Sequence, residues 1–313
     1  MPSPMHVPNP HTRLSFKRSQ EDGFISVIVP VYRDASGLAD TLASLARQTF
    51  DASRFEVIVG NDGTDEAVAR IADSFGAKTI PVAPRQGSYA ARNRALEESR
   101  GEFLAFVDAD ISVPPEWLAT GLAALRSHRY VGGRVLFPAH QLTRLSHHYE
   151  AAVAFNNSSR FRRHHYSPTA NLFAARSLFE TLGGFDTRFR SGGDAEFGDR
   201  AFRALPADLA FCEALVVFHP PRGYAALVRK VERTTLGLRD KARHYPERFG
   251  ALVPGPGRVL LIPFMPYAKV LLEGSASPWR KASLAPIALW FGLVEAGYFI
   301  AIFWFGLNRP DRG

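Results

Sequence analysis

Acidic residues with a spacing suited to metal-assisted or acid–base chemistry occur at two places in the chain. Asp108 and Asp110 follow the apolar run 103–107, and Asp194 follows a pair of glycines. Two carboxylates one residue apart can both face a divalent ion, because hard oxygen ligands suit Mg²⁺ or Mn²⁺. A third carboxylate could take a proton from an attacking hydroxyl. The simpler alternatives are that the pair caps a turn and that Asp194 caps a helix over 195–204.

The elements that would position these residues alternate along the first half of the chain. Short β-branched or apolar runs predict strands, and apolar residues at helical spacing predict helices between them. This alternation favours an α/β fold with a parallel sheet covered by helices on both faces. The predicted strands are 24–29, 55–59, 78–82 and 103–107, and the predicted helices are 38–45, 66–75 and 88–99.

Polar or turn-forming clusters follow three of the predicted strands, and open parallel sheets bind ligands at the carboxyl ends of their strands. We therefore expect a ligand site at this edge. The sequence has no G-x-G-x-x-G and no G-x-x-x-x-G-K-[ST], so it carries neither a dinucleotide fingerprint nor a P-loop. The clusters are Pro30-Val31-Tyr32, Asn61-Asp62-Gly63-Thr64-Asp65 and Asp108-Ala109-Asp110.

The composition sets broader bounds. The 313 residues are 46% hydrophobic, which is enough for the core of one large domain or two small ones. Cys212 is the one cysteine, and no charged start followed by an apolar stretch occurs near Met1, so we expect a cytosolic, reduced catalytic domain. The net charge of +8 suits nucleic acid, an anionic membrane surface or phosphorylated substrates. Residues 1–23 lack apolar periodicity and predict a flexible tail.

The last part of the chain is predicted to associate with a membrane. The segment 259–272 is apolar but interrupted by prolines and a lysine, which suits an interfacial or broken helix. In 284–307 the only charged residue is Glu295, and roughly 20 apolar residues can cross a bilayer. Arg280 and Lys281 indicate that the amino-terminal end of this segment is cytoplasmic. A buried core helix or a surface-lying helix is the alternative, because Glu295 would be costly in lipid.

Four further motifs join the strand-end clusters in a fixed order. They are Gly87 with Ala91-Arg92-Asn93, Thr169-Ala170-Asn171, Gly183-Gly184-Phe185-Asp186 and Gly192-Gly193-Asp194-Ala195-Glu196-Phe197. The ordered set, between Phe24 and about Tyr245, resembles glycosyltransferase family 2. This resemblance implies the GT-A nucleotide-sugar-binding fold, with a mostly parallel, Rossmann-like sheet. The turn 62–65 is one residue shorter than is usual in the family, so we expect different hydrogen bonding around the base.

The resemblance also implies a donor site. Pro30, Tyr32 and Asp62 would line the pocket of a uridine-type base, with Tyr32 offering a ring face and Asp62 accepting from a base N–H. Arg92 would lie near the nucleotide, and Asp108 would contact the nucleotide and ribose. The alternatives are that 61–63 is a plain tight turn and that Arg92 is a solvated helix position.

Metal and acceptor residues follow from the same resemblance. Asp110 would bind Mg²⁺ or Mn²⁺ directly, with Asp108 beside it, and His219 would lie near the metal or the pyrophosphate. A lone histidine is more often structural, and that alternative is favoured for His219. Asn171 and the glycine pair 183–184 would form the acceptor-side floor.

Asp194 is the predicted catalytic base of an inverting transfer. It occupies the position of the family's acidic base motif, although Gly193 precedes it where Glu is more frequent. Glu196 is the alternative base, and Asp199 is expected to face solvent or pair with Arg203 at helical spacing.

Two basic stretches could meet anions or be merely solvated. The first could contact a phosphate of a lipid-linked acceptor, and the second, 222–248, could cover a diphosphate or rest on anionic headgroups. The first stretch carries Arg160, Arg162, Arg163, His164 and His165.

These observations predict three regions: the tail 1–23, a GT-A catalytic domain over 24–250 and a membrane-associated or transmembrane helical segment over 251–313. The expected activity is inverting, metal-dependent transfer of a sugar from a UDP- or GDP-type donor to a hydroxyl of a lipid-linked or cell-envelope glycan. The expected location is a cell membrane, with the catalytic domain on its cytoplasmic side and no nucleic-acid partner. The alternatives are a GT-A-like nucleotidyltransferase, whose usual Gly-rich basic loop is missing after the first strand, and an inactive membrane-bound binding protein.

Overall fold

The computed structural model of the chain describes residues 23–154, 157–255, 259–273 and 278–307. All but one residue of the tail predicted over 1–23 lies outside these ranges. The described residues form two compact units. The first consists of the described residues of Met1–Val135, Asn157–Thr187 and Gly193–Val217, and the second of those of Leu136–Asn156, Arg188–Gly192 and Phe218–Gly313.

A seven-stranded sheet forms the centre of the first unit, in the order β3-β2-β1-β4-β6-β5-β7. Its first four strands are parallel, and β6 runs antiparallel to both β4 and β5. The strands are β1 (Ile25–Val31), β2 (Phe55–Asp62), β3 (Lys78–Val82), β4 (Phe103–Phe106), β5 (Tyr130–Leu136), β6 (Leu172–Ala175) and β7 (Leu209–Phe218). The sheet is therefore mixed but mostly parallel on the side that carries the predicted site.

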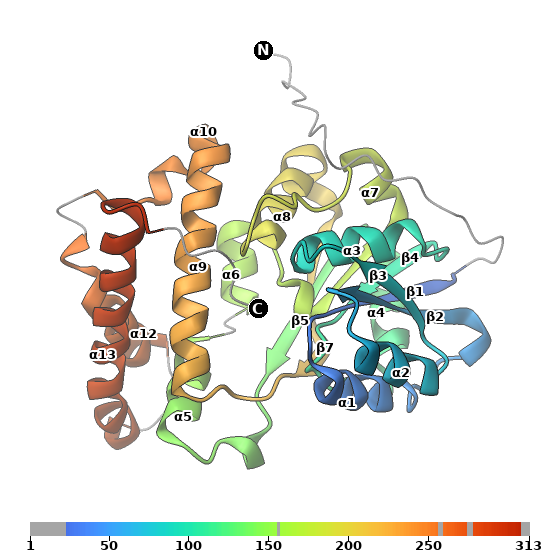
Figure 1. Ribbon diagram of the computed structural model, residues 1–313, viewed down its shortest axis with the longest axis horizontal. Coiled ribbons are helices and arrows are strands. Elements are labelled where there is room, and N and C mark those ends of the chain that lie inside the picture. Colours follow the sequence, from blue (N-terminus) through green and yellow to red (C-terminus); the bar gives the residue numbers. More distant parts are fainter. Residues whose placement is uncertain (1–22, 155–156, 256–258, 274–277, 308–313) are drawn as a thin grey trace. The chain divides into compact units, whose positions relative to one another are not determined.

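The first strands are continuous apolar runs in the sequence because both of their faces are buried. Every residue of β1 is buried, because β1 pairs with β2 on one side and β4 on the other while helices cover the sheet. Figure 1 shows α1 and α2 on one side of this part of the sheet and α3 on the other. The register aligns Val31 with Asn61, so the polar residues that follow both strands emerge at one edge.

Three helices of the first unit, α1, α2 and α3, match the predicted alternation of strands and helices. Asp34 caps α1 and Asp65 caps α2, because their side-chain oxygens accept hydrogen bonds from backbone amides of the first turn, the usual role of Asp at helix starts. The helices are α1 (Ala35–Leu45), α2 (Glu66–Ser74), α3 (Ser88–Glu97), α4 (Trp117–Leu125), α6 (Asn157–His164), α7 (Arg176–Leu182) and α8 (Gly193–Ala204).

Helix α3 lies unusually close to the sheet. A Cβ built on Gly60 of β2 would come within 2.5 Å of the carbonyl oxygen of Ala91 in α3. No side chain fits between the two backbones, so glycine at this position sets the distance from strand to helix. Tyr89 and Arg92, near the start of α3, thereby reach the carboxyl edge of the sheet.

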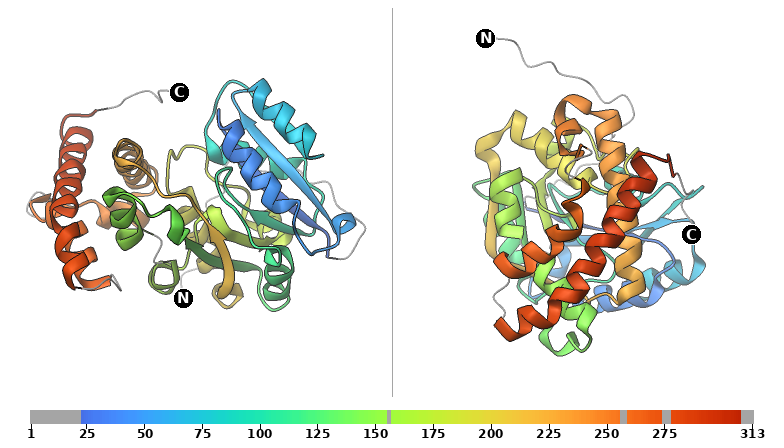
Figure 2. Two further views of the ribbon diagram at one scale, coloured as in Figure 1. Left: turned by 90° about the horizontal axis from the view of Figure 1, so that it is seen from below. Right: turned by 90° about the vertical axis from the view of Figure 1, so that its left-hand side faces the viewer.

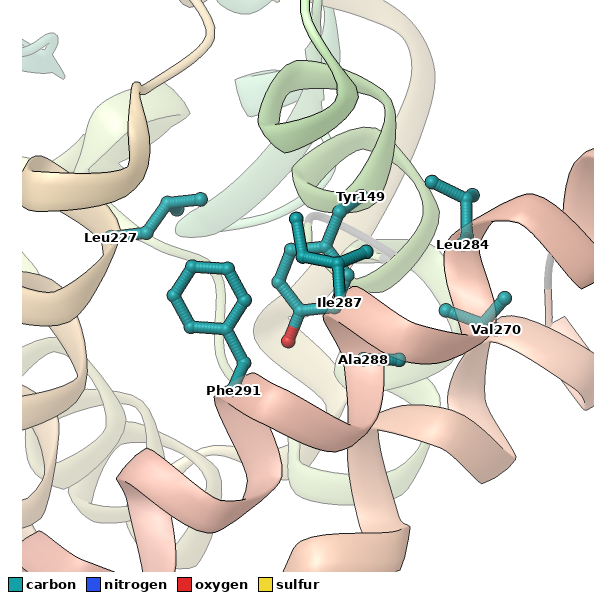
Figure 3. Close-up of a cluster of buried hydrophobic side chains, with 7 residues drawn as sticks. All are labelled: Tyr149, Leu227, Val270, Leu284, Ile287, Ala288 and Phe291. Atoms are coloured by element: carbon teal, nitrogen blue, oxygen red, sulfur yellow. The ribbon is translucent and has the colours of Figure 1, made fainter.

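The second unit is helical. Two apolar clusters hold α5, α9, α12 and α13 together, and Figure 3 shows the first, in which Tyr149 of α5 stacks on Phe291 of α13 at 4.6 Å. In Figure 2, α13 lies beside α12 and α9. The helices are α5 (Leu145–Val153), α9 (Tyr224–His244), α10 (Pro246–Phe249), α12 (Met265–Glu273) and α13 (Pro278–Phe303).

The predicted elements compare closely with the observed ones. The strand over 78–82 is confirmed at both ends, and the helices over 66–75 and 88–99 are confirmed but end one and two residues earlier. The helix predicted over 195–204 begins at Gly193, so Asp194 lies inside its first turn instead of capping it. The predicted domain boundary near 250 stays a prediction, since compactness groups α5 and α9 with the C-terminal helices.

Replacement of Gly60 by alanine tests the close contact of α3 with the sheet. Gly60→Ala should lower the free energy of unfolding by about 2 kcal/mol, because a methyl group would meet a backbone carbonyl that cannot move aside. Urea unfolding of the full chain measures this change. Gly297→Ala in α13 is the control, since its added Cβ meets nothing within 4 Å. Equal stability of the two variants would contradict the close contact.

Candidate functional site

The carboxyl edge of the parallel strands brings the predicted donor residues together. Tyr32 follows β1, Asp62 ends β2 and Asp108 follows β4, and these three strands are neighbours in the sheet. Pro30 lies within β1, where it pairs with Gly60, and is buried. The chemistry-bearing residues are therefore carried on short extensions of rigid strands.

Asp62 anchors the loop that leads into α3. Its two carboxylate oxygens accept hydrogen bonds from the backbone amides of Gln86 and Gly87, at 2.8 and 3.0 Å. A carboxylate offers about four acceptor positions, so Asp62 retains capacity for a further donor. The side chain is buried, which makes this an ordered part of the edge and not a solvated turn.

Arg85 is a site residue that sequence reasoning missed. Its guanidinium carbon lies 3.9 Å from the centroid of the Tyr32 ring, and its Nε is 3.7 Å from Asp62. It therefore rests on the ring face that was predicted to meet a nucleobase. The available signal was a basic residue two positions before Gly87, in a loop entering a helix at the ligand edge.

Arg92 pairs with Asp108. The guanidinium Nη2 of Arg92 is 2.5 Å from Asp108 Oδ1, and the Arg92 side chain is 5% exposed whereas that of Asp108 is 36% exposed. The alternative of a solvated helix position for Arg92 is thus wrong. The buried cation holds Asp108 at the edge of the site, with part of its carboxylate open to solvent.

The carboxylate pair suits a metal ion that a substrate helps to bind. Asp108 and Asp110 are both partly exposed, while Ala109 between them is buried. Among the described residues, no group of three or more His, Cys, Asp or Glu side chains could hold a metal ion. Mg²⁺ is commonly held by one or two carboxylates together with substrate phosphates, so this donor set fits such an ion.

Asp194 lies against Tyr89 of α3. The Tyr89 hydroxyl is 3.4 Å from Asp194 Oδ1 and 3.4 Å from the Asp194 backbone nitrogen. Burial, and secondarily the charge of Asp194, raises the pKa of Tyr89 above its ordinary value, so the hydroxyl stays protonated. A Cβ on Gly193 would lie 2.9 Å from the Tyr89 ring, which leaves no room for a side chain before Asp194.

Glu196 and Asn171 have structural partners. Glu196 is fully buried and accepts two bonds from Arg200, which also donates to backbone carbonyls at 182 and 184. The amide of Asn171 accepts from Trp117 and donates to the carbonyls of residues 134 and 215. Their predicted substrate contacts stay predictions. The predicted pair of Asp199 with Arg203 is confirmed at 2.9 Å.

His219 belongs to the second unit, and both of its ring nitrogens have protein partners. Nδ1 lies 2.6 Å from the carbonyl oxygen of Pro220, and Nε2 lies 2.5 Å from Nη2 of Arg222. Since arginine only donates, Nε2 is the acceptor and Nδ1 carries the proton. These contacts favour the structural alternative for His219, and its role as a metal ligand stays a prediction.

Buried Glu150 fixes the segment around His219. It accepts from the backbone amide and the guanidinium of Arg222, at 2.7 and 2.9 Å, and from Lys230 of α9 at 2.9 Å. Burial by itself would raise the pKa of Glu150, but Lys230 and Arg222 outweigh it and hold the pKa below its ordinary value. Glu150 thereby ties α5, α9 and the chain before α9 together.

A double-mutant cycle tests whether Tyr89 requires glycine at 193. In the wild-type background Gly193→Ala should lower the free energy of unfolding by about 1–3 kcal/mol, although alanine usually stabilises a helix, because the methyl group meets the ring. In the Tyr89→Ala background the same change should cost nothing. Urea unfolding of the four proteins measures the coupling, and additive costs would refute the contact.

Glu150→Gln should lower the free energy of unfolding by about 1–3 kcal/mol at neutral pH, because it leaves two cations without their buried anion. Since the folded-state pKa of Glu150 is depressed, its stabilisation is complete above the ordinary pKa of a glutamate side chain and is lost as pH falls through the lower folded-state pKa. The variant should therefore lose less stability than wild type on acidification. Glu247→Gln, at an exposed position of α10, is the control.

Sequence comparison identifies relatives over much of the chain. Residues 26–188 match the family described as Glycosyl transferase family 2. The chain is 31% identical over 221 residues to "Glycosyltransferase AglE" of Haloferax volcanii, covering 68% of this chain and 72% of that protein. It spans less than a third of "Putative glycosyltransferase EpsH" of Bacillus subtilis, at 34% identity over 97 residues.

Solved structures share the fold at low sequence identity. The mannosyltransferase PcManGT of Pyrobaculum calidifontis, in complex with GDP-Man and Mn²⁺, superposes with a TM-score of 0.55 at 21% identity, over 92% of this chain and 88% of that one. TarS 1–349 of S. aureus, in complex with UDP-GlcNAc, gives 0.51 at 18% identity, over 92% and 93%. The fold is therefore the predicted GT-A fold. With the family match over more than half of its length, this chain belongs to glycosyl transferase family 2.

Proposed function

We propose that the chain transfers a sugar from a nucleoside diphosphate donor to a hydroxyl acceptor, with inversion at the sugar carbon. One line of contacts supports this most strongly: Asp108 pairs with Arg92, Arg92 lies 5.6 Å from the Tyr89 ring centroid, and the Tyr89 hydroxyl meets Asp194. Helix α3 thus links the carboxylate proposed for the nucleotide side to the proposed base. Both sit where an α/β sheet binds its ligand.

The donor base is proposed to bind at Tyr32 and Asp62. Tyr32 offers a ring face, and Asp62 keeps acceptor capacity for a base N–H beyond its two backbone bonds. Arg85 lies over the Tyr32 ring, so a base bound there would either stack on Arg85 or displace it. Solved relatives with this fold hold GDP-Man or UDP-GlcNAc, which supports a nucleotide sugar without selecting one.

Asp110, with Asp108 beside it, is proposed to hold Mg²⁺ or Mn²⁺ together with the donor diphosphate. When bound, such an ion neutralises negative charge developing on the departing nucleotide. Arg92 contributes by orienting Asp108, because its buried guanidinium donates directly to that carboxylate. The known complex of a structural relative with Mn²⁺ agrees with this proposal.

Asp194 is the proposed general base. It would take the proton from the acceptor hydroxyl while the oxygen attacks the sugar carbon from the face opposite the nucleotide. Tyr89 orients the carboxylate from one side, and the amide of Ala195 donates to Asp194 Oδ1 at 2.9 Å. Glu196 is a poorer candidate, since Arg200 already occupies its carboxylate.

The acceptor is proposed to be a lipid-linked or cell-envelope glycan presented at a membrane. Within the described residues one helix, Lys281–Phe303, is long and apolar enough to cross a bilayer by length and composition alone. A cytoplasmic catalytic domain is part of this proposal, because the basic residues before this helix suit the anionic lipids of a cytoplasmic leaflet. Arg162 and Arg163 of α6 are exposed and could meet an acceptor phosphate.

Two carboxylate variants test the assignment. Asp110→Ala should abolish the Mn²⁺-dependent part of nucleotide-sugar binding, whereas Asp194→Asn should bind donor normally and lose roughly 10²- to 10⁴-fold in turnover. Calorimetry with a panel of UDP- and GDP-sugars, with Mn²⁺ or chelator, measures binding, and nucleotide release measures turnover. Asp199→Asn, on the exposed side of α8, is the control. Absence of binding to any nucleotide sugar would refute the proposal.

A further inference from the structure

Helix α13 has two apolar faces, and only one of them is packed. The buried face meets α5, α9 and α12 through residues that lie along one side of the helix. The opposite face carries Trp279, Trp290 and Leu293, which are 87%, 45% and 61% exposed. The buried residues are Leu284, Ile287, Ala288, Phe291, Ala296, Phe299 and Ile302.

Neighbouring segments of the second unit add further exposed apolar side chains. They come from the segment before α12, from α12 itself and from the end of α13, and these elements pack against one another. Such surfaces on soluble proteins mark interaction sites. The residues are Leu252, Leu260, Leu261, Phe264, Met265, Leu271, Trp304 and Phe305.

The packing of α9 on α13 is incompatible with a helix that crosses a bilayer. Leu227, Val228 and Val231 of α9 pack on the cluster around Phe291, and Leu238 packs on the cluster around Phe299. The same length of α9 carries four charged residues, so a spanning α13 would draw them into hydrocarbon. A charged side chain at the bilayer centre is costly and is rare in segments that span a membrane. The charged residues are Arg229, Lys230, Glu232 and Arg233.

The charge of this unit complements an anionic lipid surface. Between 218 and 250 the sequence has eight Arg or Lys residues (Arg222, Arg229, Lys230, Arg233, Arg239, Lys241, Arg243 and Arg248) against three acidic ones (Glu232, Asp240 and Glu247). Arg229, Arg233 and Arg243 are exposed. Basic residues beside an apolar, tryptophan-rich face are typical of helices that lie in the headgroup region.

We propose that α13 lies in the plane of a membrane surface that contains anionic lipids, with its Trp279, Trp290 and Leu293 stripe in the headgroup–acyl boundary, and that it does not cross the bilayer. This inference deepens the membrane attachment included in the proposed function. It accounts for both faces of α13: protein covers one and lipid covers the other.

Tryptophan depth distinguishes a helix in the membrane plane from one that spans it. Trp279 and Trp304 are 25 residues apart in sequence, roughly 37 Å along a helix, with Trp290 between them. In the plane all three should be quenched most by lipids brominated near the headgroup. In a spanning helix Trp290 would be quenched most by lipids brominated near the chain ends, and this result would overturn the proposal.

The depth measurement uses the full chain bound to vesicles of phosphatidylcholine and phosphatidylglycerol, in variants that keep one of the three tryptophans and replace the other two by Phe. Trp117, the fourth tryptophan, is 1% exposed in the first unit and provides an unquenched reference in every variant. Fluorescence that no brominated lipid quenches would also overturn the proposal.

Vesicle flotation tests the apolar stripe separately. The double variant Trp290→Ser, Leu293→Ser should bind mixed vesicles at least tenfold more weakly than wild type, and Ala282→Ser on the same exposed face should bind as wild type does. Unchanged binding of the double variant, or burial of the stripe in a dimer seen by light scattering without lipid, would contradict the proposal. Nucleotide release measured on the same proteins distinguishes the proposed transferase activity from the proposed membrane attachment. Turnover without vesicle binding would contradict only the membrane attachment.

Discussion

The position of helix α3 on the sheet is the constraint on which the candidate site depends. Gly60 lets the helix backbone approach β2 more closely than any side chain would allow. At that distance Arg92 reaches Asp108 and Tyr89 reaches Asp194, while Asn93 exchanges two hydrogen bonds with the backbone of Phe185. One helix therefore sets the positions of both carboxylates proposed to act on opposite faces of the sugar. A displacement of about 1 Å would disturb both together.

Charged residues have different roles in the two units. In the first, buried Arg92 leaves its carboxylate partner partly open to solvent, which suits a site that must meet an ion and a diphosphate. In the second, Glu150 is enclosed by Arg222 and Lys230, which suits a joint between helices. The apolar outer face of α13 stays exposed within the described residues of its unit, and the proposed lipid surface would cover it.

The sequence predicted the strands and the family well, because apolar runs and strand-end motifs are local signals. The strand 78–82 and the edge that joins Asp62 to Asp108 follow directly from such patterns.

The local signal failed where contacts are distant in sequence. Nothing near Gly193 indicates that the ring of Tyr89 fills its space, and nothing near Arg85 indicates that it stacks on Tyr32. The spacing of Glu196 made it an alternative base, whereas in the structure its carboxylate is buried and paired with Arg200. The hydrophobic periodicity and composition of α13 likewise could not predict whether it spans a bilayer or lies on its surface, since that depends on the charged residues of α9, which packs against it.

The anomeric configuration of the transferred sugar tests the account most directly. A single displacement with one base opposite the leaving nucleotide must invert the sugar carbon, whereas a covalent intermediate would preserve its configuration. NMR of the glycoside formed by transfer to the acceptor reports the configuration through the one-bond coupling constant between the anomeric carbon and its proton. The account predicts an anomer opposite to that of the donor sugar. A product with the donor's configuration would contradict the single displacement and the role proposed for Asp194.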